Sequence, residues 1–127
     1  EGGDLWMKFE QTELEGLTID YETLSEIMNH AGFYPVYDYE RVTFDYKMVD
    51  ANNDDTYYFR VQAYAIEGEI PSPHCTVKLM KPILGKHYYP HGVEYDEDFP
   101  DKVIKRCEEK INTIKKALQA ENVSIKW

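Results

Sequence analysis

The chain has 127 residues, the size of one ordinary domain, and its composition (43% hydrophobic, 14% aromatic) is too apolar for intrinsic disorder. Its formal net charge of −10 argues against a nucleic-acid-binding protein, because phosphate recognition needs clustered lysine and arginine. Eleven tyrosines against five phenylalanines indicate many half-buried positions, where the ring packs and the hydroxyl reaches water or another subunit. No apolar run has the length of a membrane span and no secretory signal is visible, so we expect a cytoplasmic protein without a membrane partner.

The two ends of the chain differ from its middle. Residues 1–6 precede Met7 and are unlike the sequence that follows, so we expect an upstream extension or a cloning remnant. Residues 121–127 are expected to form a tail, either loose or with one short strand. A single domain is therefore expected over residues 7–120.

The N-terminal part of the domain predicts a short strand or extended lead-in over residues 8–18, with a bend at Gly16, and then a helix over residues 21–31. The helix has apolar positions at the three-and-four spacing of one buried face. Asp20 is suited to cap it, and Gly32 to end it in a left-handed conformation. The lead-in has the apolar anchors Phe9, Leu14 and Leu17, and the helix has the stripe Leu24, Ile27, Met28 and Ala31.

Residues 41–68 predict a β-hairpin at the centre of a sheet. Apolar and polar residues alternate over 42–48 and again over 57–65, and the Asn- and Asp-rich run 50–55 between them suits a turn. If Phe44 lies opposite Val61, then Asp45 faces Arg60 on the other side of the sheet, a pairing worth roughly 0.5 kcal/mol. Only even slips compete with this register, because a slip of one residue inverts the faces of one strand.

The segments on either side of the hairpin are less regular. Residues 33–40 predict an edge strand, because Pro35 cannot donate to a ladder of hydrogen bonds. Residues 75–81 predict another strand, with Cys75 on its apolar face. Residues 83–100 contain two Gly, two Pro, three Tyr and two His, and are expected to be an irregular segment pinned by its rings.

The last predicted element is a long amphipathic helix over residues 101–120. Its apolar seam is Ile104, Cys107, Ile111, Ile114 and Leu118. Two amphipathic helices and one half-apolar sheet predict an α+β domain, with an antiparallel sheet of three to five strands and both helices packed on one face.

Few residues point to chemistry. His87 and His91 have a spacing that could hold a metal on a helix, but Pro90 and Gly92 make a helix there unfavourable, so we favour a structural aromatic loop. The 50–55 turn lacks the glycine and distal glutamate of a calcium-binding EF-hand. We therefore expect no metal site and no cofactor.

A cysteine nucleophile is also disfavoured. Cys75 and Cys107 both fall on predicted apolar faces, and neither has the exposed, electropositive surroundings of a reactive thiol. The chain has neither a glycine-rich phosphate loop nor a GxSxG motif. We expect no catalytic residues and favour a protein that is not an enzyme.

The outer face of the hairpin is the least explained surface. Its mixture of charges and tyrosines could line a binding groove or a dimer interface, while the alternative is an ordinary solvent face. The residues that share this face are Asp45, Lys47, Tyr58, Arg60, Gln62 and Tyr64, with Lys78 a further candidate.

Three segments carry a resemblance to a known family: RVTFDYK (41–47), TYYFRVQAYAIEGEI (56–70) and VKLMKPILGKHYYPHGVEY (77–95). They resemble the YugN-like family, small proteins of Gram-positive bacteria, over most of the chain from Met7 to about Ala120. The resemblance implies a bacterial cytoplasmic protein without an established activity, and no catalytic residues are carried over from it. Residues before Met7 have no place in the family pattern.

Three functions are carried forward. The first is a non-enzymatic domain that self-associates as a homodimer or binds a partner. The second is a small-molecule-binding protein or enzyme with a site between residues 83–100 and the outer sheet face. The third is a metal protein that uses His74, His87 and His91. The candidate ligand-binding residues of the second are Arg60, Tyr58, Gln62, His87, Tyr88, Tyr89 and His91.

Overall fold

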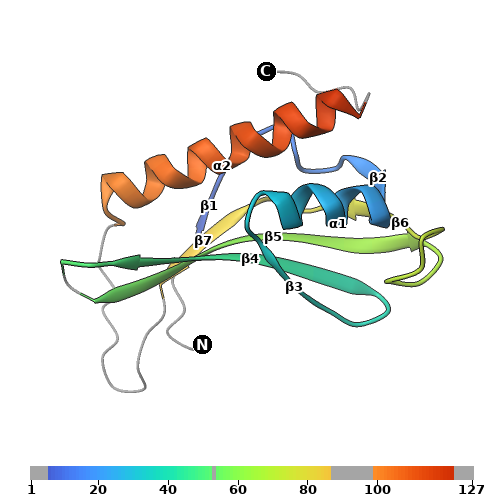
Figure 1. Ribbon diagram of the computed structural model, residues 1–127, viewed down its shortest axis with the longest axis horizontal. Coiled ribbons are helices and arrows are strands. Elements are labelled where there is room, and N and C mark those ends of the chain that lie inside the picture. The colour runs from blue at the N-terminus through green and yellow to red at the C-terminus, as the bar shows by residue number, and fades with distance from the viewer. Residues whose placement is uncertain (1–5, 53, 87–98, 122–127) are drawn as a thin grey trace.

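The computed structural model describes residues 6–52, 54–86 and 99–121, and within them the chain forms two helices and one antiparallel sheet (Figure 1). Both helices lie on the same side of the sheet in this view. The elements in chain order are β1 (Trp6–Lys8), β2 (Thr18–Asp20), α1 (Tyr21–His30), β3 (Tyr34–Tyr37), β4 (Arg41–Asp50), β5 (Asp55–Glu67), β6 (Thr76–Leu79), β7 (Ile83–Lys86) and α2 (Asp101–Ala120).

The β4–β5 hairpin is the centre of the sheet and has the predicted register. Phe44 pairs with Val61, and Asp45 pairs with Arg60. The inner face of the hairpin is apolar and buried, with Phe44, Phe59 and Val61 at 1% exposure or less. The alternation of side chains along both strands therefore sets which face meets the helices.

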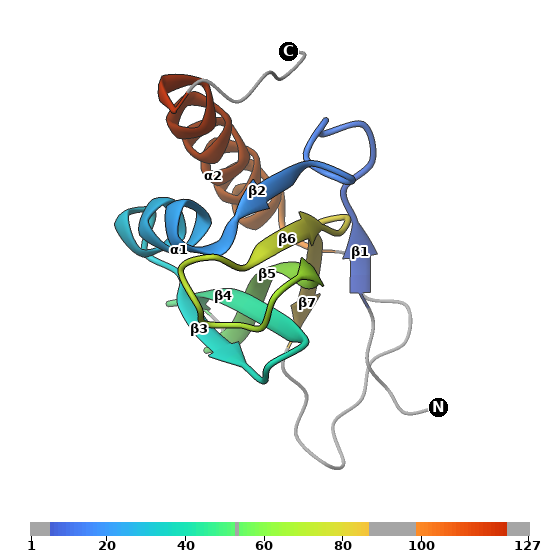
Figure 2. The same cartoon turned by 90° about the vertical axis from the view of Figure 1, so that its right-hand side faces the viewer.

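The far edge of β5 pairs with two strands in succession. Tyr58 pairs with Gly85 of β7, and Tyr64 pairs with Lys78 of β6. Beyond them, β1 pairs with β7 and β2 pairs with β6. The strands β6 and β7 thus lie one after the other along β5, on a single path across the sheet that is interrupted at residues 80–82. The strands β1 and β2 form the next path, with residues 9–17 inserted between them (Figure 2).

This pairing corrects two predictions. The described residues form a sheet of seven strands rather than three to five, because the outer two paths are each divided into short strands. Residues 83–86 form β7 and are not irregular, since pairing with β5 and β1 orders them from both sides. Residues 87–98 lie outside the described part of the chain. The first strand begins at Trp6, one residue before the expected start of the domain.

The helices form as their sequences predict. Asp20 accepts a 3.0 Å hydrogen bond from the backbone nitrogen of Thr23 and caps α1, and Gly32 follows with a φ of +93°. On α2 most of the predicted seam is buried, while Ile104 is half-buried and Val103 is buried beside it. Within the described residues, neither helix is long and apolar enough to cross a membrane.

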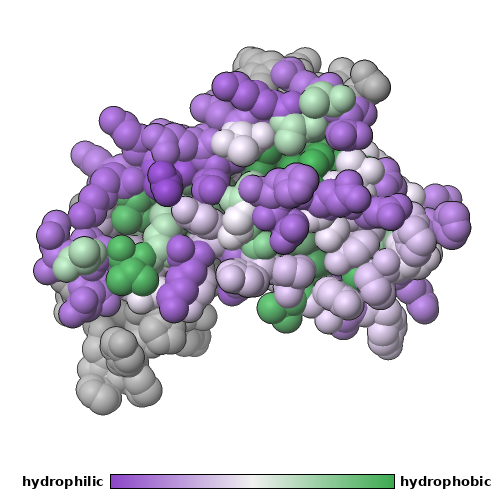
Figure 3. All heavy atoms as spheres, viewed as in Figure 1, coloured by the Kyte–Doolittle hydropathy of each residue, from purple (hydrophilic) through white to green (hydrophobic). Residues whose placement is uncertain are grey.

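The core fills the space between the helix layer and the inner face of the sheet. Hydrophilic side chains cover much of the helix layer, and apolar ones appear below α2 (Figure 3). The inserted loop 9–17 also contributes to the core: Phe9 packs edge-on against Phe59 at 5.4 Å, and Leu14 is fully buried. Neither described helix lies on the opposite, outer face of the sheet (Figure 1), and that face is where a site is to be sought.

Candidate functional site

The middle of the outer face holds polar side chains that are already paired with one another. Arg60 donates two hydrogen bonds to Asp45, of 2.7 and 2.9 Å, in the parallel geometry that a guanidinium and a carboxylate favour. Gln62 donates a 3.2 Å hydrogen bond to the hydroxyl of Thr43. Arg60 and Gln62, two of the predicted binding residues, are therefore engaged within the sheet itself.

The edge strand β3 brings large apolar side chains next to these pairs. Tyr34 is paired with Asp45 and Val36 with Thr43, so both side chains share the outer face. They are 76% and 69% exposed. Apolar side chains this exposed on an edge strand are unusual unless something covers them.

The backbone edge of β3 is protected against pairing. Asp38 donates its backbone N–H to Arg41 on β4 at 3.0 Å, and N–H groups alternate in direction along a strand. The nitrogens of Val36 and Tyr34 therefore face β4, and the nitrogen of Pro35 faces the open edge. Because proline has no N–H to donate there, another strand cannot continue the ladder regularly. The face of β3 is a better contact surface than its edge.

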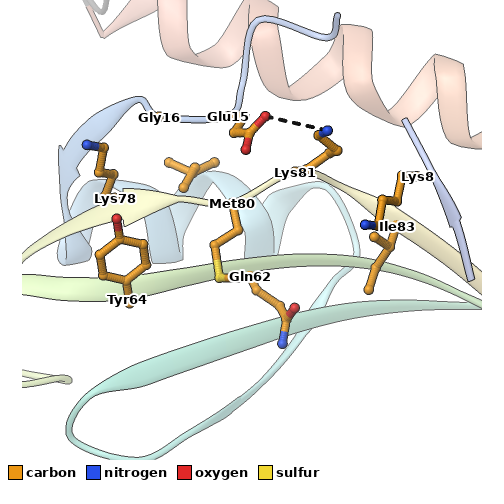
Figure 4. Close-up of a pocket in the computed structure, with 10 residues that line it drawn as sticks. Lys8, Glu15, Gly16, Gln62, Tyr64, Lys78, Met80, Lys81 and Ile83 are labelled. Atoms are coloured by element: carbon orange, nitrogen blue, oxygen red, sulfur yellow. Dashed lines mark ion pairs between the residues drawn. The ribbon is translucent and has the colours of Figure 1, made fainter. Parts of the chain in front are cut away.

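The other half of the outer face contains a groove of about 630 Å³ (Figure 4). It lies at the break between β6 and β7, beside Glu15 and Gly16 of the loop 9–17. Met80, Ile83 and the ring of Tyr64 supply apolar surface, and lysines stand at both ends of the view. The lining residues are Lys8, Glu15, Gly16, Gln62, Tyr64, Lys78, Leu79, Met80, Lys81 and Ile83.

The three lysines of the groove are not equivalent. Lys81 contacts Glu10 at 2.7 Å and Glu15 at 4.0 Å, and its hydrogen bond to Glu10 raises the pKa of the Lys81 ammonium. Lys81 therefore ties down the loop 9–17. Lys8 and Lys78, in contrast, form no ion pair with any residue in the described ranges. Within this part of the chain they are two positive charges without a counter-charge, in a protein of net charge −10.

The predicted site residues are only partly brought together. Tyr58, Arg60 and Gln62 share the outer face, and of these Gln62 lines the groove. His87, Tyr88, Tyr89 and His91 lie outside the described residues. The sequence analysis missed Lys8, Glu15, Met80 and Lys81, which meet only because β1 and the loop 9–17 fold back beside β6 and β7.

Two other candidate chemistries find little support in the described part of the chain. Desolvation raises the pKa of the Cys75 thiol, and it raises the pKa of Cys107 to about 12, so both buried thiols stay protonated near neutral pH. Among the described residues, no three His, Cys, Asp or Glu side chains come together as a metal site. His74 is exposed, and its two proposed partners are outside this range.

Comparison with known proteins identifies the family. Residues 10–117 match the YugN-like family. The chain belongs to this family. It is 39% identical to the uncharacterized protein YlbA of Bacillus subtilis (strain 168) over an alignment of 117 residues that covers 89% of this chain and 96% of YlbA.

A solved structure of the YugN-like family has the same fold. The crystal structure of the uncharacterized conserved protein YugN from Geobacillus kaustophilus HTA426 aligns with a TM-score of 0.82 and 42% sequence identity. The alignment covers 93% of this chain and 99% of that protein. The resemblance inferred from the sequence is thereby confirmed, and the names of both relatives leave the activity open.

Proposed function

We propose that this protein is a non-enzymatic domain of the bacterial cytoplasm that acts by self-association through the β3–β4 half of its outer sheet face. The observation that carries the proposal is the exposure of Tyr34 and Val36, 76% and 69%, on an edge strand. Burying a valine and a tyrosine in each copy removes apolar surface from water, which stabilises a complex.

The polar neighbours of these residues support contact with a second copy. Arg60 and Asp45 already neutralise each other, and Gln62 and Thr43 already share a hydrogen bond. A surface whose polar groups are paired in the free protein loses little when water is excluded from it. It also presents little net charge, so two copies can approach despite the overall charge of −10.

A sheet-to-sheet contact explains why the face and not the edge is apolar. Two sheets can pack face to face about 10 Å apart with their side chains interdigitated. Pro35 at the open edge prevents uncontrolled strand addition while leaving the face available. The contact would be the same patch on both subunits, as in most homodimers.

The direct test is the mass of the protein in solution over a range of concentrations. Light scattering at high micromolar concentration is expected to give twice the 15.0 kDa of one chain, with dissociation on dilution. A monomer at every concentration, including at moderate salt where repulsion between the acidic chains is screened, counts decisively against self-association.

A further inference from the structure

The groove on the other half of the outer face suggests a ligand. Its volume of about 630 Å³ lies in the range that small-molecule sites occupy, roughly 300 to 1,000 Å³. Four of its ten lining residues are charged, and Met80, Ile83 and the ring of Tyr64 supply apolar surface among them. It uses β5, β6, β7, β1 and the loop 9–17, so it does not depend on the β3–β4 contact proposed above.

The charges of the groove define the chemistry of its occupant. Lys8 and Lys78 have no ionic partner among the described residues, whereas Lys81 is held by Glu10 and Glu15. In a protein with 24 acidic side chains against 14 basic ones, two lysines in one groove that have no ion pair within the described ranges favour an anion there.

The positions of the two lysines define the shape of the occupant. Lys78 and Lys8 stand at opposite ends of the close-up, with Met80 between them and Ile83 beside Lys8 (Figure 4). Lys8 is paired with Ile83, five residues from Lys78 along the β6–β7 path, so the two Cα atoms are roughly 17 Å apart if this path is straight with the usual strand spacings. An elongated molecule with an acidic group at each end and an apolar middle matches this order.

The remaining lining residues favour carboxylates over phosphates. Arginine, which binds phosphate with two parallel hydrogen bonds, is absent from the described residues of the lining. The backbone N–H of Gly16, which lines the groove, donates a 2.8 Å hydrogen bond to the carbonyl oxygen of Leu79, so it is already engaged within the protein. Glu15 at the rim repels a group of high negative charge. A ligand with two singly charged groups, one for Lys8 and one for Lys78, balances the charges of these two lysines.

We propose that this groove binds a small aliphatic dicarboxylate, with one carboxylate at Lys78 beside the hydroxyl of Tyr64, the other at Lys8, and the hydrocarbon segment over Met80 and Ile83. The lysines act as point charges, and the apolar floor selects the length of the chain between the acidic groups. The affinity falls with ionic strength, because the contacts lie near the surface.

The test is titration of the intact protein with succinate, adipate, suberate and sebacate, followed by calorimetry and by the methyl resonance of Met80. We expect binding to peak at one of the longer chains and to be weaker for the monocarboxylate octanoate. Replacement of either lysine (Lys78→Gln or Lys8→Gln) is expected to weaken binding about fivefold. Glu15→Gln, which removes a repulsive charge, is expected to strengthen it.

The matched control is Lys47→Gln, since Lys47 is an exposed lysine of the same face outside the groove. Absence of binding by every dicarboxylate at millimolar concentration overturns the proposal. So does binding that survives replacement of both Lys8 and Lys78, or that falls equally with Lys47→Gln. Val36→Lys is expected to leave dicarboxylate binding unchanged, so the groove and the self-association surface are tested separately.

Discussion

Lys110 of α2 donates a 2.6 Å hydrogen bond to the backbone carbonyl oxygen of Ala31, at the end of α1. Its ammonium also lies 4.3 Å from the centre of the Tyr46 ring on β4. One side chain therefore joins both helices to the sheet, through a charge-assisted hydrogen bond to a helix terminus and a cation–π contact.

Replacement of this lysine is expected to destabilise the fold. Lys110→Met keeps the apolar stem but removes both contacts, and we expect a loss of about 2 kcal/mol in the free energy of unfolding. Urea unfolding followed by circular dichroism measures it. The control is Lys105→Met on the exposed side of α2, expected to change stability by less than about 0.5 kcal/mol. Equal effects of the two substitutions would contradict this role for Lys110.

The ion pair of Arg60 and Asp45 is expected to contribute modestly to the free energy of unfolding. The two side chains are 29% and 20% exposed, so solvent screens their attraction. A double-mutant cycle with Arg60→Met and Asp45→Asn is expected to give a coupling of about 0.5 to 1 kcal/mol. Urea unfolding of the four proteins measures the coupling, and a value near zero would show that the two groups are paired without mutual stabilisation.

Two glycines with left-handed backbones form a matched pair. Gly68 has a φ of +73°, and a Cβ there would lie 3.2 Å from the Cα of Cys75. Gly16 has a φ of +88°, but a Cβ there would meet nothing within 4 Å. Both alanine substitutions carry the conformational cost of about 1 kcal/mol, and Gly68→Ala adds a steric cost against backbone. In thermal unfolding, the melting temperature of Gly68→Ala is expected to be clearly lower than that of Gly16→Ala. The reverse order would be inconsistent with this geometry.

The cap of α1 makes stability depend on pH in the acid range. The backbone hydrogen bond from Thr23 lowers the pKa of Asp20 in the folded protein. The contribution of the ionised Asp20 cap to the free energy of unfolding is therefore complete above the ordinary pKa of an aspartate, about 3.9. It is lost as the pH falls through the lower pKa of Asp20 in the folded protein. Asp20→Ala is expected to cost about 1 kcal/mol at pH 7.

Asp20→Asn separates the cap from the titration. Asparagine can still accept the hydrogen bond from Thr23 but cannot be protonated in this range. Relative to the natural protein, this variant is expected to gain stability as pH falls below about 4. Parallel unfolding curves of the two proteins between pH 7 and pH 3 would contradict the expectation.

The features predicted from sequence are those that local pattern determines. The β4–β5 hairpin has a period of two on both strands and a turn between them, so even its register, Asp45 against Arg60, follows from matching faces. The range of α2 follows from one apolar seam after Pro100. The long strands and the helices are therefore visible without tertiary information.

The features that were missed depend on distant pairing. The strands β1 and β2 have three residues each and β7 has four, too few for a periodic signal. The strands β1 and β2 are ordered by partners about 60 to 80 residues away along the chain, such as Gly85 for Trp6, and β7 is ordered between β1 and β5. The groove between Lys8 and Lys78 is a product of the same pairings, so its residues could not be grouped from the sequence.

The central claim, self-association through Tyr34 and Val36, is tested most directly by one pair of substitutions. Val36→Lys places a charge in the proposed interface. Val49→Lys places the same charge on an equally apolar, 59% exposed position of β4, outside the interface because β3 adjoins only residues 42–45 of that strand. Sedimentation equilibrium is the measurement. The account predicts a monomer for Val36→Lys and a dimer for both Val49→Lys and the natural protein. The same mass for both variants would contradict it.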